Sequence, residues 1–340
     1  MPPLRIKGVN YDLGVALQTN GYKGYNLSEV QMYEELYAIK NDLNCNAIRI
    51  YGEEIDKLIE CAEIAIRLGL QVWFSPRLIN ADFRETLDYI DKCSLAAENL
   101  RKIAPDLVLV VGNEFSLDIK GIIEGEKIEE RISKLSKLSS IIKYSLGYKI
   151  HDKLNDFLKL AVIRARENFK GEITYASGRW EKVNWEIFDI TSYNYYKNIY
   201  NSWIYRRTVR NAVRANKKFA ISEYGCCSYK GADKKGAWGY TVVDWKWPRF
   251  RLKKVLVRDE KVQSDYLLDC LKIFAEEQVS AAFVYTFVAR KAYFDTEPLF
   301  DLDMANFGLI KVIRPGNENE AYCWEKKKSF EALSKYFKNQ

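Results

Sequence analysis

Residues 107–114 read LVLVVGNE, an apolar run that stays unbroken until it ends in Asn113 and Glu114. A strand with one face in solvent would alternate apolar and polar residues, which this run does not do. It is instead typical of a strand buried on both faces of a parallel sheet. Its polar residues follow at the carboxyl end, where the loops of parallel α/β folds carry functional groups.

Seven other short runs rich in apolar residues have the same character. They are Arg5–Asn10, Ala47–Tyr51, Gln71–Pro76, Ile173–Ser177, Ile190–Asn194, Phe219–Glu223 and Ala281–Phe287. Helical spacing of apolar residues fills the intervals, at Ser28–Leu43, Glu53–Leu68, Asp82–Ile103, Lys127–Leu146, Asp152–Asn168, Lys182–Phe188, Trp203–Asn216, Lys261–Glu277 and Trp324–Phe337. Eight βα units without a Gly/Pro-rich linker predict an α/β fold, a (β/α)8 TIM barrel with residues 1–340 as one domain.

Two connections are longer than a barrel needs. Phe115–His151 follows the fourth predicted strand and Gly225–Glu260 follows the seventh. Loops at the carboxyl ends of barrel strands build active sites, so we expect substrate contacts in both.

Composition narrows the possible functions. The 53 Lys and Arg residues only slightly exceed the 46 Asp and Glu residues, and the single histidine, His151, excludes a mechanism with two imidazoles. The seven scattered cysteines form no CxxC pair, and Cys226-Cys227 are expected to be buried thiols rather than a redox pair. The sequence contains neither GxGxxG after the first strand nor GxxxxGK[ST]. We therefore expect no cofactor and no metal.

Apolar runs of the length that a membrane helix needs, roughly 20 residues, do not occur, and the first residues lack a signal-peptide pattern. These features predict a cytoplasmic protein without membrane contact. The oligomeric state has no sequence signal.

The polar strand ends suggest a chemistry. In a barrel they meet at one mouth, and two of them are carboxylates, Glu114 after the fourth strand and Glu223 after the seventh. Paired carboxylates flanking a scissile bond are what glycoside hydrolysis uses, one as proton donor and one as nucleophile or base. Arg49 and Tyr193 are placed to keep one glutamate ionised while the other keeps its proton.

Val111-Gly112-Asn113-Glu114 and Ile221-Ser222-Glu223-Tyr224-Gly225 resemble the Asn-Glu and Glu signatures of the large clan of retaining β-glycosidases on TIM barrels. This resemblance implies that Glu114 is the acid/base and Glu223 the nucleophile. It also implies that Asn113 hydrogen-bonds the sugar 2-hydroxyl.

The resemblance extends to two further strand ends. It implies that Arg49, in Ile48-Arg49-Ile50-Tyr51, lies beside the nucleophile, and that Tyr193 contacts it. The chain departs from the clan at Phe115, where proline is commoner, and at the eighth strand, which ends in Tyr285-Thr286-Phe287 without tryptophan. Tyr285 or Phe287 is expected to form the floor of the sugar subsite instead.

Other substrate contacts are expected from residues at the mouth and in its loops. Flat aromatic faces stack on pyranose rings, which favours Trp180, Trp238 and Trp245, and Asn10 ends the first strand. The acidic segment Asp295–Asp303 is expected to be a solvated loop, with Ca²⁺ or an amino sugar as alternatives.

These observations predict a retaining glycoside hydrolase acting on carbohydrate. A transglycosylase with the same residues and a catalytically silent carbohydrate-binding barrel remain alternatives. In the silent barrel, the glutamates would form ion pairs with Arg49 or Arg179. The basic stretches at Arg206–Lys218 and Arg249–Arg258 allow nucleic-acid binding, but charged helix faces are usually only solvated, and we expect no nucleic-acid partner.

Overall fold

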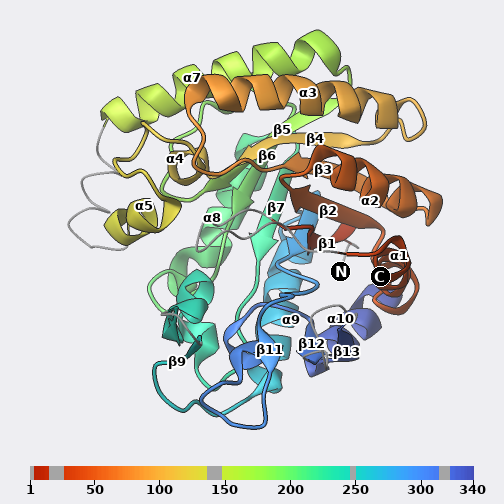
Figure 1. The fold of residues 1–340 in the computed structure, drawn as a ribbon, viewed down its shortest axis with the longest axis vertical. Helices are drawn as coiled ribbons and strands as arrows, with labels where there is room; N and C mark the ends of the chain where they lie inside the picture. The colour runs from red at the N-terminus through yellow and green to blue at the C-terminus, as the bar shows by residue number, and fades with distance from the viewer. Residues whose placement is uncertain (1–3, 15–26, 136–147, 246–249, 314–321) are drawn as a thin grey trace. The chain divides into compact units, whose positions relative to one another are not determined.

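A computed structural model of the chain describes residues 4–14, 27–135, 148–245, 250–313 and 322–340. Within them, eight parallel strands form a closed barrel in the order β1-β10-β7-β6-β5-β4-β3-β2 (Figure 1). The TIM-barrel prediction is confirmed. The strands are β1 (Ile6–Asp12), β2 (Ala47–Gly52), β3 (Gln71–Pro76), β4 (Val108–Asn113), β5 (Glu172–Gly178), β6 (Ile190–Asn194), β7 (Phe219–Tyr224) and β10 (Ala281–Val284).

Helices follow most of these strands. They are α1 (Glu29–Tyr37), continued by one π-helical turn, η1 (Ala38–Asp42), then α2 (Ile55–Arg67), α3 (Phe83–Arg101), α4 (Phe115–Asp118), α5 (Ile128–Leu135), α7 (Tyr148–Asn168), α8 (Ser202–Ala215), α9 (Glu260–Glu276) and α10 (Lys328–Lys338). None of the helices described is long and apolar enough to cross a membrane.

The chain divides into two compact units. Unit 1 comprises Met1–Asp12, Val30–Ile48 and Tyr195–Gln340, and unit 2 comprises Leu13–Glu29 and Arg49–Asn194. The organisation as one domain stays a prediction.

Unit 2 shows why its helices begin and end where they do. Asp82 caps α3 by accepting from the Glu85 backbone N at 2.9 Å, and the Glu85 carboxylate accepts from the Asp82 backbone N at 2.9 Å. Such a capping box contributes about 1 kcal/mol. After α2, Gly69 adopts a left-handed backbone with φ of 72°, the conformation that glycine allows at a helix end. The capped helix α3 then lies beside α7 (Figure 1).

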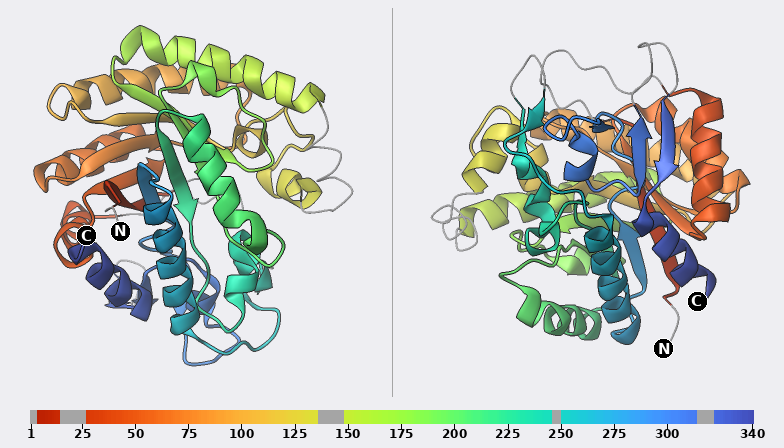
Figure 2. Two further views of the ribbon diagram at one scale, coloured as in Figure 1. Left: turned by 180° about the vertical axis from the view of Figure 1, so that it is seen from behind. Right: turned by 90° about the horizontal axis from the view of Figure 1, so that it is seen from below.

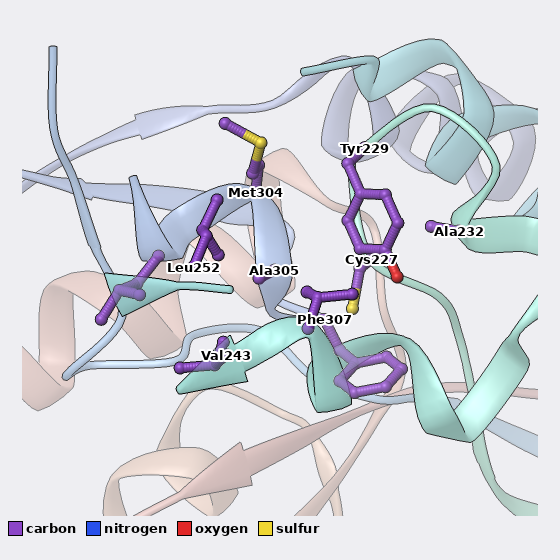
Figure 3. Packing of buried hydrophobic residues seen from close by; sticks show 10 residues of the cluster. Cys227, Tyr229, Ala232, Val243, Leu252, Met304, Ala305 and Phe307 are labelled. Carbon is purple, nitrogen blue, oxygen red and sulfur yellow. The ribbon is translucent and has the colours of Figure 1, made fainter. Parts of the chain in front are cut away.

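In unit 1, α9 and α10 lie side by side (Figure 2). The loops after β7 and β10 are held by a buried apolar cluster of their own, which we call the loop cluster. Figure 3 shows its packing; its members are Cys227, Tyr229, Ala232, Val242, Val243, Leu252, Leu302, Met304, Ala305 and Phe307. Because its members come from both loops, the loop cluster packs the segment after β7 against the segment after β10. The same unit contains two small sheets, β8 (Val243–Asp244) with β9 (Arg251–Leu252), and β11 (Tyr293–Phe294) with β12 (Ile310–Ile313) and β13 (Cys323–Lys326).

Several predicted elements are wrong in type or extent, and α7 starts at Tyr148, four residues before the predicted Asp152. The predicted helix Lys182–Phe188 is a single 3₁₀ turn, η2 (Trp185–Ile187), which Asn184 caps with its side chain. Trp324 lies in β13, because Val312 of β12 pairs with it, and the last helix starts only at Lys328. The eighth barrel strand ends at Val284, three residues earlier than predicted. The part of the predicted helix Lys127–Leu146 beyond Leu135 lies outside the described residues.

Gly225, directly after β7, tests how closely the strand ends pack. A Cβ at this position would lie 2.4 Å from the carbonyl oxygen of Tyr285. Because this neighbour is backbone, it cannot swing aside. We expect Gly225→Ala to lower the free energy of unfolding by about 1–3 kcal/mol, measured by urea denaturation.

Gly231→Ala is the matched control for that variant. Its Cβ would meet nothing within 4 Å, but its φ is 85°, so it should cost only the backbone strain of about 1 kcal/mol. A Gly225→Ala protein as stable as the wild type would contradict the close packing.

Candidate active site

Glu114 stands at the turn between β4 and α4 with a left-handed backbone, φ 42° and ψ 51°. Non-glycine residues adopt this conformation rarely, and it costs roughly 1–2 kcal/mol. Its backbone N donates to the Ala176 carbonyl at 2.9 Å, and its own carbonyl accepts from the backbone N of Leu117 and Asp118. The chain therefore changes direction at Glu114, between the end of β4 at Asn113 and the start of α4 at Phe115.

The Glu114 carboxylate belongs to a line of hydrogen bonds across the ends of β6, β4 and β2. Asn194 Nδ2 donates to Glu114 Oε1 at 2.9 Å and to Asn113 Oδ1 at 3.1 Å. Arg49, which is 1% exposed, donates from Nη2 to the same Asn113 oxygen at 2.9 Å and from Nε to Ser75 Oγ at 3.1 Å. Since two donors occupy the Asn113 oxygen, the hydrogen bonds define which end of this amide is the oxygen and which is the NH₂ group.

Glu223 lies at the end of β7 and is 8% exposed. Its Oε2 accepts a hydrogen bond from the Tyr196 hydroxyl at 2.8 Å, and its backbone carbonyl accepts from the Tyr195 N at 2.9 Å. The phenol of Tyr196 thus orients the Glu223 carboxylate. Burial of a carboxylate is costly without such a partner.

Asn10 anchors the strand that carries Glu223. Its Nδ2 donates to the Ser222 carbonyl at 2.9 Å and lies 3.2 Å from the Val284 carbonyl, while its own carbonyl accepts from Thr286 Oγ1 at 2.8 Å and Phe287 N at 2.9 Å. These contacts join Asn10 to the end of β7, through Ser222, and to the end of β10 and the residues after it, through Val284, Thr286 and Phe287. They indicate that Asn10 fixes the position of the residue before Glu223.

Two aromatic rings, Tyr285 and Phe307, pack against the ring of Tyr196. Tyr196, Tyr285 and Phe307 meet edge to face, with ring centroids 5.6–6.4 Å apart. All three pack against or belong to the loop cluster. Phe287, by contrast, is completely buried between Tyr11 and Trp324. Of the two predicted subsite floors, the partly exposed Tyr285 is therefore better placed than Phe287.

The remaining predicted site residues have these positions. Tyr193 lies against the Arg179 guanidinium, 4.4 Å from the ring centroid, and against Trp185. Trp180 donates from Nε1 to Ser116 Oγ at 2.9 Å, two residues after Glu114. Trp238 and Trp245, in the loop after β7, are 37% and 54% exposed. Their roles in binding substrate stay predictions.

The sequence interpretation did not select Asn194, Tyr196 or Glu181 as site residues. Asn194 carried a signal: side chains of a strand alternate, so Tyr193 and Asn194 lie on opposite sides of β6. Tyr196 lies two residues beyond the end of that strand, where the alternation no longer applies. Glu181 had no comparable signal, because it lies in an irregular loop after β5. It is buried, and its pKa is raised mainly by desolvation.

The acidic segment after β10 is exposed at Thr296 and Glu297, as predicted, and differs from the prediction at its other end. Asp301 and Asp303 are buried rather than solvated, and Arg258 pairs with both at 2.8 and 2.9 Å. Lys327, also fully buried, pairs with Asp303 at 3.0 Å. The two carboxylates therefore hold the loop through internal ion pairs. Among the described residues, no group of three or more His, Cys, Asp or Glu is arranged to hold a metal ion.

The first basic stretch is also occupied by internal pairs. Arg206 and Arg210 of α8 both bind Glu277, at 2.6 and 2.8 Å. That the chain has no nucleic-acid partner stays a prediction.

Comparison with known proteins identifies the fold. No protein-family model and no curated protein matches the chain. A GH113 β-mannanase from Alicyclobacillus acidocaldarius is 13% identical, with a TM-score of 0.59 over 98% of this chain and 97% of that one. A β-glycosidase from Pyrococcus horikoshii is 11% identical, with a TM-score of 0.59 over 99% and 94%. A β-glucuronidase from an uncultured Clostridium sp. is 12% identical, with a TM-score of 0.55 over 99% of this chain and 51% of that one. At these identities the likeness establishes the TIM-barrel fold alone.

Cys226 and Cys227, close to Glu223 in the sequence, are free, buried thiols, as predicted. Burial raises the pKa of both well above that of an ordinary thiol, and it raises the pKa of Cys270 to about 12. Of the seven cysteines only Cys323 is exposed. We expect Ellman's reagent to modify one thiol per native chain and seven after unfolding, because the thiolate is the reactive species.

Cys323→Ser is the control and should leave no fast-reacting thiol in the native chain. Rapid modification of two further thiols, assigned to Cys226 and Cys227 by mass spectrometry, would contradict their burial.

Proposed function

We propose that this protein is a retaining glycoside hydrolase that cleaves β-glycosidic bonds, with Glu223 as nucleophile and Glu114 as acid/base. One observation carries the proposal. Asn194 and Tyr196, two residues apart in the sequence, each donate a hydrogen bond to one of the two glutamates, at 2.9 and 2.8 Å. Each glutamate is thus oriented by a hydrogen bond from a neighbouring side chain, which suits a carboxylate with a defined part in glycoside hydrolysis.

In the first step, Glu223 attacks the anomeric carbon and forms a glycosyl ester. The bond to the leaving oxygen breaks, and that oxygen takes the proton of Glu114. The hydrogen bond from Tyr196 to Oε2 orients the Glu223 carboxylate for this attack. Glu114 then removes a proton from water, which attacks the anomeric carbon of the glycosyl ester. The bond to the Glu223 oxygen breaks, the Glu223 carboxylate is restored, and the sugar leaves with its original configuration.

The residues around Glu114 suit binding of the sugar. Because Arg49 and Asn194 occupy the Asn113 oxygen, the Asn113 NH₂ group is directed to donate to a sugar hydroxyl. Such hydrogen bonds strengthen in the transition state of glycosidases. In this proposal Arg49 acts through Asn113, and its cationic charge adds to the polarity of the site.

The fold comparisons support the same class of substrate. The three similar barrels named above are described as a β-mannanase, a β-glycosidase and a β-glucuronidase. We therefore propose a carbohydrate with a β-glycosidic bond as substrate. Tyr285 and the exposed rings of Trp238 and Trp245 are candidates for stacking on its sugar rings.

A panel of 4-nitrophenyl β-glycosides tests the proposal. It should contain glucoside, galactoside, mannoside, xyloside, glucuronide and N-acetylglucosaminide. We expect turnover of at least one of them by the wild type, and a loss of at least 10⁴-fold in kcat/KM in Glu223→Ala, since the nucleophile is removed. Azide should restore part of the Glu223→Ala activity by attacking from the vacated side, and NMR should identify the product as the α-glycosyl azide.

Glu114→Ala is the matched variant. In it, azide should attack the glycosyl ester and give the β-glycosyl azide, because two inversions retain the configuration. Wild-type activity in Glu223→Ala, or the same azide product from both variants, would overturn the assignment of roles. Binding of sugars without turnover of any member of the panel would favour a silent binding barrel.

A further inference from the structure

The turn that carries Glu114 is held by two side chains that the proposed mechanism does not use. The Phe115 backbone N donates to the Tyr175 hydroxyl at 2.6 Å, and the Ser116 backbone N donates to Glu181 Oε1 at 3.0 Å. These are the first two backbone N–H groups of α4. They have no partner inside the helix, since the first N–H groups of any helix lack one.

Tyr175 and Glu181 form one connected unit. The Tyr175 hydroxyl accepts from the Phe115 backbone N and in turn donates to Glu181 Oε2 at 2.8 Å. Tyr175 is fully buried and Glu181 is 9% exposed. The two residues therefore hold consecutive N–H groups directly after Glu114 through a continuous line of hydrogen bonds.

The surroundings of Glu181 consist of donors. Ser116 N is bonded to one carboxylate oxygen, while Tyr175 OH, Ser177 Oγ and Gly178 N lie 2.8, 3.2 and 3.2 Å from the other. A carboxylate, with two accepting oxygens, matches this arrangement, and an amide does not. Trp180 adds a bond to the same turn by donating to Ser116 Oγ.

This arrangement explains how Glu114 keeps an unfavourable backbone. A left-handed conformation at a non-glycine residue persists only where its surroundings determine it. The N–H groups of the next two residues point at Tyr175 and Glu181, and a change of the Glu114 backbone would break both bonds.

We infer that Glu181 is a positioning residue for Glu114: acting with Tyr175, it fixes the left-handed turn so that the Glu114 carboxyl group is directed at the leaving oxygen of the substrate. The inference rests on the proposed function of Glu114 as acid/base. Glu181 touches the backbone of the turn and takes no part in proton transfer. Its loss should therefore impair the acid step specifically, because a misdirected acid no longer protonates the leaving group.

The test is the dependence of kcat/KM on the leaving group, since kcat/KM reports the first, acid-assisted step. The substrates are the phenyl and 2,4-dinitrophenyl β-glycosides of the sugar that the 4-nitrophenyl panel identifies. Phenol needs protonation to depart, and 2,4-dinitrophenol does not. For Glu181→Gln we expect a loss of about 10- to 100-fold on the phenyl glycoside, a part of what a general acid contributes. On the dinitrophenyl glycoside the loss should stay within about threefold.

Tyr175→Phe provides a second variant in case Glu181→Gln does not fold. It removes only the hydroxyl that links Phe115 N to Glu181, and it should show the same dependence on the leaving group to a smaller extent. Tyr89→Phe is the matched control within the same unit. Its hydroxyl donates to the Glu53 carbonyl at 2.6 Å, and its removal should leave the ratio of the two kcat/KM values unchanged.

The outcomes separate the inference from the proposed function. If the wild type hydrolyses the panel but Glu181→Gln and Tyr175→Phe lose equal activity on both leaving groups, or none, the positioning role is overturned while the proposed function stands. If the wild type turns over no glycoside, the proposed function fails, and the role of Glu181 fails with it.

Discussion

A carboxylate taken out of water must find hydrogen-bond donors, and this constraint shapes the polar ends of the barrel strands. Glu223, 8% exposed, is held by Tyr196. Glu114 is held by Asn194, and Glu181 by donors on both of its oxygens. The cost of an unpaired buried charge is several kcal/mol, so each carboxylate dictates which side chains surround it. The same donors that stabilise the fold thereby orient the groups to which we assign chemistry.

Buried charges elsewhere in the chain have a different character. Asp303 is enclosed by Arg258 and Lys327, and Glu35 by Arg290 at 2.6 Å and the Tyr11 hydroxyl at 2.7 Å. In these clusters cations pair with the carboxylates, as expected for groups that hold loops together. Glu114 and Glu223 each accept a hydrogen bond from a neutral donor, Asn194 and Tyr196 respectively. Such a donor orients the carboxylate, as a group that transfers a proton or forms an ester requires.

Much of the fold could be predicted from the sequence, because strands buried on both faces appear as apolar runs. The runs at β3 and β6 coincide with the observed strands, and α2 ends at Arg67, one residue before the predicted Leu68. The failures have a common cause. Trp324, Tyr196 and Glu181 obtain their positions from contacts with residues far away in the sequence. Local spacing cannot reveal the pairing of β13 with β12, nor a carboxylate that reaches back 65 residues from Glu181 to Ser116.

The central claim is that Glu223 forms a covalent bond to the sugar, and trapping of that intermediate tests it most directly. The 2,4-dinitrophenyl 2-deoxy-2-fluoro-β-glycoside of the hydrolysed sugar reacts in the first step, while the fluorine slows the second. Mass spectrometry of the intact chain and of its peptic peptides should then find one fluoroglycosyl group per chain, on the peptide that contains Glu223. The Glu223→Gln chain should not be labelled. A label on another residue, or an unlabelled chain that still hydrolyses the parent glycoside, would contradict the account.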